Sequence, residues 1–179
     1  MKHIIYILLL AIVAGFTKCG KEKPTISNDV PGLPPATQTG ANTFGCLVNG
    51  VPWVPQGSNG TNNLSIDYDP GFNKGIFNIV AYKFTIPTSE QIIVGIRDSL
   101  NFLTAPTTLA LSRNSIYSIS YGKDCDWFNQ HADVLSSGTL TIRKLDRNNG
   151  IISGEFDAIM VKSSCDTIKI TKGRFDFKF

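Results

Sequence analysis

Acidic, aromatic and amide side chains gather in one short stretch of the chain, GKDCDWFNQHAD, at residues 122–133. Trp127 and Phe128 form an aromatic pair beside Asp124 and Asp126, a combination that can stack on a sugar ring and hydrogen-bond its hydroxyl groups. The structural alternative is that the pair closes one end of the core. The sequence favours this alternative and keeps these four residues as candidate ligand-binding residues.

Patterns typical of catalysis or metal binding are weak. His131 is the one histidine after the first few residues, and the cysteines lack C-x-x-C spacing, which argues against a zinc site. Glu155 and Asp157 are spaced to share a strand face, as calcium ligands or glycosidase carboxylates can, but such pairs usually face solvent. No serine lies in a G-x-S-x-G motif. We therefore predict no enzymatic activity, no metal and no cofactor.

Cysteine usage predicts one disulfide. Three cysteines follow Cys19, and a protein exported from the cytosol can pair two of them. Cys46 lies in an apolar stretch and is expected to be a small buried side chain. Cys125 and Cys165 both lie in polar, Asp-flanked stretches, so we predict that they pair. Closing this span would stabilise the fold by about 4 kcal/mol in the chain-entropy model.

The start of the chain indicates export. A basic start is followed by an uninterrupted apolar run from Ile4 to Phe16, which is typical of a signal peptide and too short for an ordinary membrane span. Cys19 follows almost at once and resembles the lipidation site of bacterial lipoproteins, although Phe16 and Lys18 stand where that pattern prefers Leu and a small residue. We predict a signal peptide over 1–18 and lipidation of Cys19; a plain secreted protein or a retained anchor is the alternative.

Residues 19–43 are expected to form a lipid-anchored flexible linker. They contain four prolines and few large apolar residues, so they cannot bury enough surface to offset the entropy of ordering. As a flexible coil the linker would reach about 25–30 Å. The charged residues Lys21, Glu22 and Lys23 resemble export signals of surface lipoproteins. The expected location is the outer membrane, facing either the surface or the periplasm, with the lipid as the membrane contact.

The remainder, 44–179, has the length of a single domain with one core. Without Lys2 and Lys18, fifteen Lys and Arg side chains face fourteen Asp and Glu side chains, and the basic ones are not clustered, so we expect no nucleic-acid partner. Asn49-Gly50 between two apolar runs predicts a hairpin, and apolar residues alternate in Gly75–Phe84, Gln91–Arg97, Ile151–Val161 and Gly173–Phe179. We predict an antiparallel β-sandwich or flattened barrel of about 8–10 strands.

Both ends of this domain are similar to an uncharacterised family of Bacteroidota lipoproteins. The family has a T-F-G-C-x-V-N-G start followed by an apolar residue and Trp, as in TFGCLVNGVPW here, and a G-R-F-D end, as in GRFDFKF. This resemblance supports the fold and the location but implies no reaction. Ser99 and Thr167 follow an Asp and precede an apolar residue, which resembles the O-glycosylation acceptor of these bacteria. The sequence therefore predicts an envelope lipoprotein with a non-catalytic binding or interaction domain for a glycan or an envelope protein, or alternatively a glycan-binding accessory module of a polysaccharide-uptake system.

Overall fold

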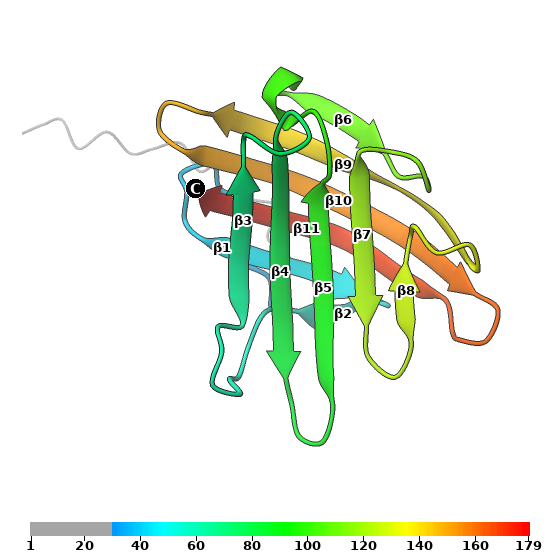
Figure 1. Ribbon diagram of the computed structural model, residues 1–179. Coiled ribbons are helices and arrows are strands. Elements are labelled where there is room, and N and C mark those ends of the chain that lie inside the picture. The colour runs from blue at the N-terminus through cyan, green and yellow to red at the C-terminus, as the bar shows by residue number, and fades with distance from the viewer. Residues whose placement is uncertain (1–29) are drawn as a thin grey trace, which may run out of the picture.

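The computed structural model describes residues 30–179, so the predicted signal peptide, Cys19 and the first part of the predicted linker lie outside the described residues. The protein is an all-β sandwich of two antiparallel sheets that do not close into a barrel (Figure 1). The six-stranded sheet has the spatial order β2 (Val51–Trp53), β1 (Thr43–Val48), β11 (Ile168–Lys178), β10 (Ile151–Lys162), β9 (Val134–Asp146) and β6 (Thr107–Ala110). The five-stranded sheet has the order β3 (Leu64–Asp69), β4 (Ile76–Phe84), β5 (Ser89–Ile96), β7 (Tyr117–Gly122) and β8 (Asp126–Phe128).

The predicted hairpin between β1 and β2 is confirmed. Asn49 and Gly50 form its turn with φ values of 49° and 83°, and two residues with positive φ are what a tight two-residue hairpin of this kind requires. The side-chain oxygen of Asn49 also accepts a hydrogen bond of 2.8 Å from the backbone N–H of Lys169 on β11. The hairpin therefore closes against β11 and carries Trp53 into the core.

The core lies between the sheets because each long strand buries every second residue. On β4 and β5 the inward positions are apolar, and β5 is paired in register with both β4 and β7. The inward positions of β7 and β10 are also apolar or aromatic, and on β7 the intervening Ser118 and Ser120 are buried as well. The inward residues of these strands are Phe77, Ile79 and Ala81, Ile92, Val94 and Ile96, Tyr117, Ile119 and Tyr121, and Ile152, Phe156, Ala158 and Met160. The two-residue period read from the sequence thus places the core correctly.

The C-terminal strand is central. β11 lies between β1 and β10, and its Phe175 and Phe177 are buried in the core. The tight turn that joins β9 to β10 lies beside the C-terminal end of β11. In this turn Gly150 has a φ of 63°, and a side chain there would collide with the carbonyl oxygen of Phe179. The strand end is thus held between two neighbours, as its regular alternation indicates.

Residues 30–42, which we call the N-terminal strap, lie along the outer face of the six-stranded sheet. Asp176 on β11 points outward into this strap and is only 1% exposed. Its carboxylate accepts hydrogen bonds from the hydroxyl of Thr37 (2.7 Å), from both the N–H (2.9 Å) and the hydroxyl (3.3 Å) of Thr39, and from the N–H groups of Gly40 (2.8 Å) and Ala41 (3.2 Å). The strap has no strand structure, and this carboxylate satisfies its backbone donors in place of a sheet ladder.

Two further side chains hold the strap. The guanidinium of Arg174 donates to the carbonyl of Pro34 (3.3 Å), and the ammonium of Lys144 donates to the carbonyl of Gln38 (3.1 Å). The sequence analysis assigns these residues to the flexible linker of residues 19–43. The structure differs, because outward charges on β11 and β9 provide partners for a segment that has few apolar side chains of its own. The folded body therefore includes the strap.

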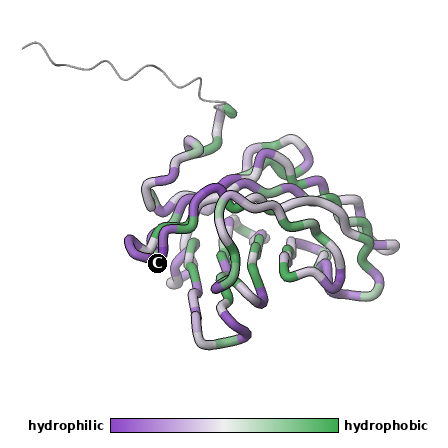
Figure 2. Tube along the Cα trace, turned by 90° about the horizontal axis from the view of Figure 1, so that it is seen from above, coloured by the Kyte–Doolittle hydropathy of each residue, from purple (hydrophilic) through white to green (hydrophobic). Residues whose placement is uncertain are grey.

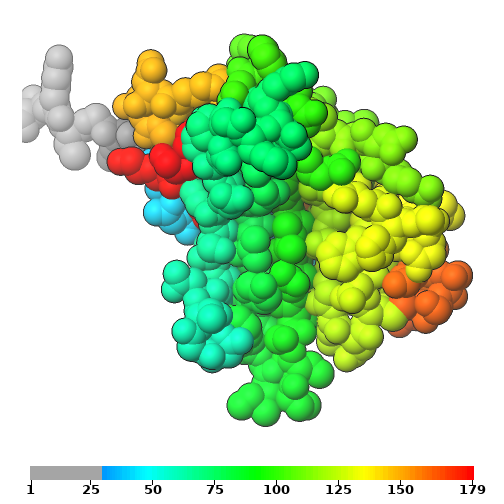
Figure 3. Space-filling model, in the orientation of Figure 1, coloured from blue at the N-terminus to red at the C-terminus, as the bar shows by residue number. Residues whose placement is uncertain are grey.

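The strands of the two sheets cross at a steep angle, as Figure 1 shows from the front and Figure 2 from above. Where sheets cross in this way their corners diverge, and side chains from the two layers no longer fill the space between them. At one corner the turn between β10 and β11 lies beside the segment between β7 and β8 (Figure 3), and a disulfide joins Cys165 to Cys125 across it. β8, for which the sequence analysis predicts no strand, is the short edge strand at this corner.

Candidate functional site

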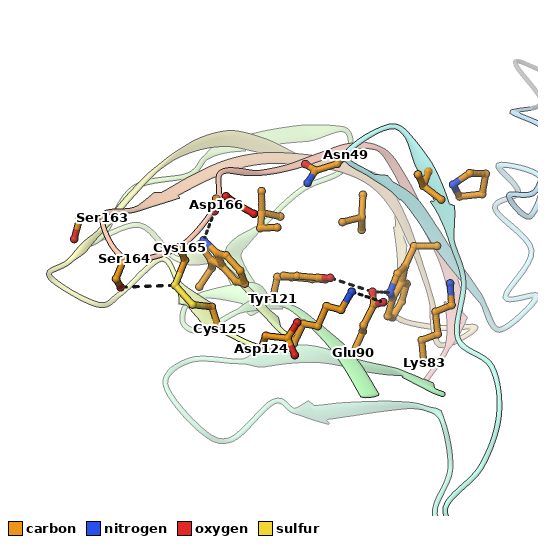
Figure 4. A pocket seen from close by; sticks show the side chains of 17 residues that line it. Asn49, Lys83, Glu90, Tyr121, Asp124, Cys125, Ser163, Ser164, Cys165 and Asp166 are labelled. Carbon is orange, nitrogen blue, oxygen red and sulfur yellow. Dashed lines mark hydrogen bonds and ion pairs between the residues drawn. A yellow bond between two sulfur atoms is a disulfide. The ribbon is translucent and has the colours of Figure 1, made fainter. Parts of the chain in front are cut away.

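A cavity of about 790 Å³ lies at the corner closed by the disulfide (Figure 4). We call it the corner cavity. Four connections surround it: the β1–β2 hairpin, the ends of β4 and β5 next to their shared turn, the β7–β8 hairpin and the β10–β11 turn. Its volume falls within the range of roughly 300–1,000 Å³ that is usual for small-molecule sites.

Glu90 on β5 is the central polar group of the corner cavity. One carboxylate oxygen, Oε2, accepts a hydrogen bond of 2.8 Å from the indole N–H of Trp53 and one of 3.0 Å from the hydroxyl of Tyr121. The other oxygen, Oε1, lies 3.7 Å from the ammonium of Lys123. In Figure 4 the Tyr121 and Glu90 side chains point toward each other. The carboxylate on β5 is therefore contacted by side chains from two other strands, β2 and β7, and from one turn.

The strand period explains why Glu90 points inward. Ile92, Val94 and Ile96 are buried on the inner face of β5, and Glu90 occupies the next position of the same face, where β5 begins. Tyr121 continues the buried face of β7 in the same way. The sequence analysis missed Glu90 as a site residue. A carboxylate in register with an apolar strand face was the signal that could have found it.

Tyr121 is protonated in this setting. Burial raises the pKa of its phenol, and the negative charge of Glu90 and the hydrogen bond between the two groups raise it further. A phenol that keeps its proton can go on donating to the carboxylate. The hydroxyl of Tyr121 therefore remains a hydrogen-bond donor over the neutral pH range.

Trp127 is buried on the inner side of β8 and its indole N–H donates a 3.0 Å hydrogen bond to the backbone carbonyl of Asp166. This bond links the two sheets beside the disulfide, as the core-closing interpretation of Trp127 requires. Trp127 and Asp124 line the corner cavity. Asp126 and Phe128 are neighbours of Trp127 on a three-residue strand and so lie on its outer face, and neither lines this cavity. The structure thus brings together two of the four candidate ligand-binding residues.

The predicted disulfide between Cys125 and Cys165 is confirmed. Among residues 30–179, Cys46 is the cysteine that remains free, and it is fully buried, as expected for a small core side chain. Burial raises the pKa of its thiol, which keeps it in the unreactive protonated form. The disulfide forms part of the cavity wall, so the same bond that closes the fold also shapes the candidate site.

The other candidate residues lie elsewhere. The carboxylate of Glu155 pairs with Arg143 at 2.6 Å, and Asp157 accepts hydrogen bonds from the backbone N–H (3.2 Å) and hydroxyl (2.6 Å) of Thr139. Glu155 and Asp157 therefore bind side-chain and backbone groups of β9 on the outer face of the six-stranded sheet. His131 is exposed and its ring lies 4.9 Å from that of Phe128.

The two candidate O-glycosylation residues differ in exposure. Thr167 is exposed just after the disulfide, whereas Ser99 is partly buried and its hydroxyl donates a 2.6 Å hydrogen bond to Asp98. Within the described part of the chain, no three His, Cys, Asp or Glu side chains come together as metal ligands. Over the same residues, the structure contains no helix that is long and apolar enough to cross a membrane.

Comparison with known proteins adds nothing to these observations: the chain matches no family model, no curated protein and no solved structure.

Proposed function

We propose that this protein is a non-catalytic binding protein of the cell envelope, anchored through Cys19, and that the corner cavity is its ligand site. The supporting observation is Glu90, a carboxylate held by Trp53 and Tyr121 inside a cavity of small-molecule size. Carboxylates placed beneath a cavity and fixed by neutral donors are suited to orienting a ligand. The anchoring part of the proposal rests on the sequence of residues 1–29 and on the resemblance to Bacteroidota lipoproteins.

The cavity favours a hydroxylated ligand. Its wall combines aromatic rings with the amide of Asn49 and the hydroxyls of Ser163 and Ser164, and such mixed walls bind the apolar faces and hydroxyl groups of sugars. This supports the accessory glycan-binding role as the second candidate function. In this version the residues involved are Trp127 and Asp124 together with Glu90, and Phe128 and Asp126 are not involved.

The proposal can be tested by titrating the ¹⁵N-labelled mature chain with a panel of monosaccharides and small envelope-derived saccharides. We expect amide shifts to cluster at Glu90, Tyr121 and Trp127, and Glu90→Gln to weaken them. Asp126→Asn is the matched control, because Asp126 lies on the outer face of β8. Shifts confined to other surfaces, or none with any compound of the panel, would contradict the proposed site.

A further inference from the structure

Building on the proposed function, we propose that the corner cavity selects ligands carrying a protonated amine, with the amine bound at Glu90 and hydroxyl groups at the rim. The class that fits is a small hydroxylated amine such as an amino sugar. Four features of the cavity lead to this proposal: an unused carboxylate oxygen, an ammonium already placed beside it, an excess of acidic groups, and an aromatic floor.

The two oxygens of Glu90 are used unequally. Oε2 accepts both neutral hydrogen bonds, from Trp53 and Tyr121, so both of its lone pairs are already used. Within residues 30–179, Oε1 accepts no hydrogen bond; the ammonium of Lys123 lies 3.7 Å from it, which is too long for one. One carboxylate oxygen therefore remains ready for a ligand donor, and the charge-assisted bonds that an ammonium donates are the strongest available to it.

Lys123 shows which chemistry the position accepts. Its side chain is 40% exposed, against 16% for Glu90, so it reaches the carboxylate from the mouth of the cavity. Exposed ion pairs of this kind contribute little to stability, since water competes for both charges. An ammonium brought by a ligand can therefore displace Lys123 at little cost and take a shorter, better desolvated position.

The charges around the cavity favour a cation. Glu90, Asp124 and Asp166 line the cavity with Lys83 and Lys123, and Lys83 lies opposite Glu90 across the β4–β5 pair. Among the described residues, Asp124, Asp166 and Lys83 take part in no ion pair, so the lining carries one more carboxylate than ammonium groups. A bound cation would neutralise the net negative charge of the lining, whereas a bound anion would increase it.

Aromatic side chains complete this environment. Trp53, Tyr121 and Trp127 all line the cavity with Glu90 among them, and their rings exclude water from one side of the carboxylate. Aromatic groups next to a carboxylate are frequent surroundings of bound ammonium groups. Partial exclusion of water also strengthens the attraction between the carboxylate and a bound cation.

The test compares three sugars of similar size that differ in charge: glucosamine, N-acetylglucosamine and glucuronate. Binding to the mature full chain is measured by calorimetry at mildly acidic pH, where glucosamine is protonated. We expect glucosamine to bind about tenfold or more tighter than the other two, from the strength of a charge-assisted hydrogen bond. Glu90→Gln should remove this difference.

Lys123→Gln gives the second arm and does not depend on the stability of Glu90→Gln. Removing the competing ammonium should tighten glucosamine and weaken glucuronate, while Lys172→Gln on the far face of the six-stranded sheet changes the same net charge and should alter neither. Equal or better binding of N-acetylglucosamine would overturn amine selectivity and leave the saccharide site standing. Tighter binding of glucuronate than of glucosamine, reduced by Lys123→Gln, would also overturn amine selectivity. So would the absence of binding by all three sugars.

Discussion

At the scale of single residues, two carboxylates join parts of the chain that are far apart in sequence. Asp176 holds the N-terminal strap from the outside of the six-stranded sheet, and Glu90 organises the corner cavity from the inside of the other sheet. Each is fixed by several donors from distant parts of the chain. The neighbouring sequence places Glu90 on the apolar face of β5, but it does not reveal the hydrogen-bond partners of either carboxylate, because the donors come from other elements.

Asp176→Asn should lower the free energy of unfolding by about 2–4 kcal/mol, because an amide replaces a nearly buried carboxylate that accepts five hydrogen bonds. Chemical denaturation monitored by tryptophan fluorescence measures this loss. Asp126→Asn, an exposed change of the same chemistry, should stay within about 0.5 kcal/mol of the parent. An equal denaturation midpoint for the two variants would contradict the role given to Asp176.

Asp176 should also contribute to acid sensitivity. Burial raises the pKa of Asp176, but the hydrogen bonds from Thr37, Thr39, Gly40 and Ala41 together outweigh it, so its pKa lies below the usual value. A lowered folded-state pKa gives stability that is complete above the unfolded pKa of about 3.9 and is lost as the pH falls through the folded pKa. When unfolding midpoints are measured over a pH series, the midpoint of Asp176→Asn should fall less than that of the parent as the pH is lowered. An equal fall in the two proteins would contradict the contribution of Asp176 to acid sensitivity.

At the scale of elements, the turns at the corner are held by a covalent bond and by hydrogen bonds. The disulfide connects the β7–β8 hairpin of one sheet to the β10–β11 turn of the other, and the indole of Trp127 reaches the same turn at Asp166. β8 and β2, the shortest strands at this corner, pair with only one neighbour each. The cavity wall therefore depends on these cross-sheet links more than on sheet pairing.

Replacing Cys125 and Cys165 with serine should lower the free energy of unfolding by about 4 kcal/mol in the chain-entropy model, since the bond closes a 40-residue span. Urea denaturation with and without reductant measures the effect. Reductant should destabilise the parent and leave the double variant unchanged, because the remaining described cysteine, Cys46, is free and buried. A parent protein insensitive to full reduction would contradict this prediction.

Alternating strands could be predicted from the sequence because burial of one face repeats every second residue. This was enough for the β1–β2 hairpin, β4, β5, β10 and the end of β11, where apolar residues fill the inner face. β8 was missed because three residues, one of them acidic, give too short a pattern. The ordering of the strap was missed because it depends on Asp176, more than a hundred residues away in sequence.

The candidate site could be predicted only in part, for the same reason. Trp127 and the disulfide were identified from local composition, whereas Phe128 and Asp126 were grouped with Trp127 on adjacency alone. Adjacent residues of a strand point to opposite faces of the sheet. Because β8 pairs with β7, Trp127 points to the inner face, whereas Asp126 and Phe128 point to the outer face. Glu90 acquires its role from Trp53 and Tyr121, which lie 37 and 31 residues away.

At the scale of the whole molecule, the sandwich closes late in the sequence. β11 pairs with β1, near the start of the domain, and with β10, so the last strand joins the two ends of the chain. Phe175 and Phe177 bring aromatic side chains into the core at the same point. The six-stranded sheet cannot be completed until this strand has been added.

Deleting Phe175–Phe179 should therefore unfold the domain, since it removes two buried aromatic residues and the Asp176 contact to the strap. Circular dichroism and gel filtration should show loss of cooperative unfolding and of the compact state. Deleting Phe179 alone, which is half-buried at the end of the chain, should leave a folded protein. A soluble, cooperatively unfolding form without residues 175–179 would refute the central role of β11.

Membrane attachment belongs to the same scale and concerns residues outside the described part of the chain. We predict that intact-mass analysis of protein from its native host will show cleavage before Cys19 and an acyl group on it. Cys19→Ala should move the protein from the membrane to the soluble fraction, whereas Cys46→Ala should not. A parent protein that carries no acyl group and fractionates as a soluble species would refute anchoring; the same spectra would show any glycan on Ser99 or Thr167.

The strap has a mechanical consequence. Tension applied to the chain ahead of residue 30 is transmitted first to the contacts of the strap with Asp176, Arg174 and Lys144, and only afterwards to β1. Because five hydrogen bonds end on a single carboxylate, we expect the strap to detach as a unit and lengthen the chain before force reaches the sandwich. If Cys19 anchors the protein as proposed, pulling on the anchor would then leave the shape of the corner cavity unchanged.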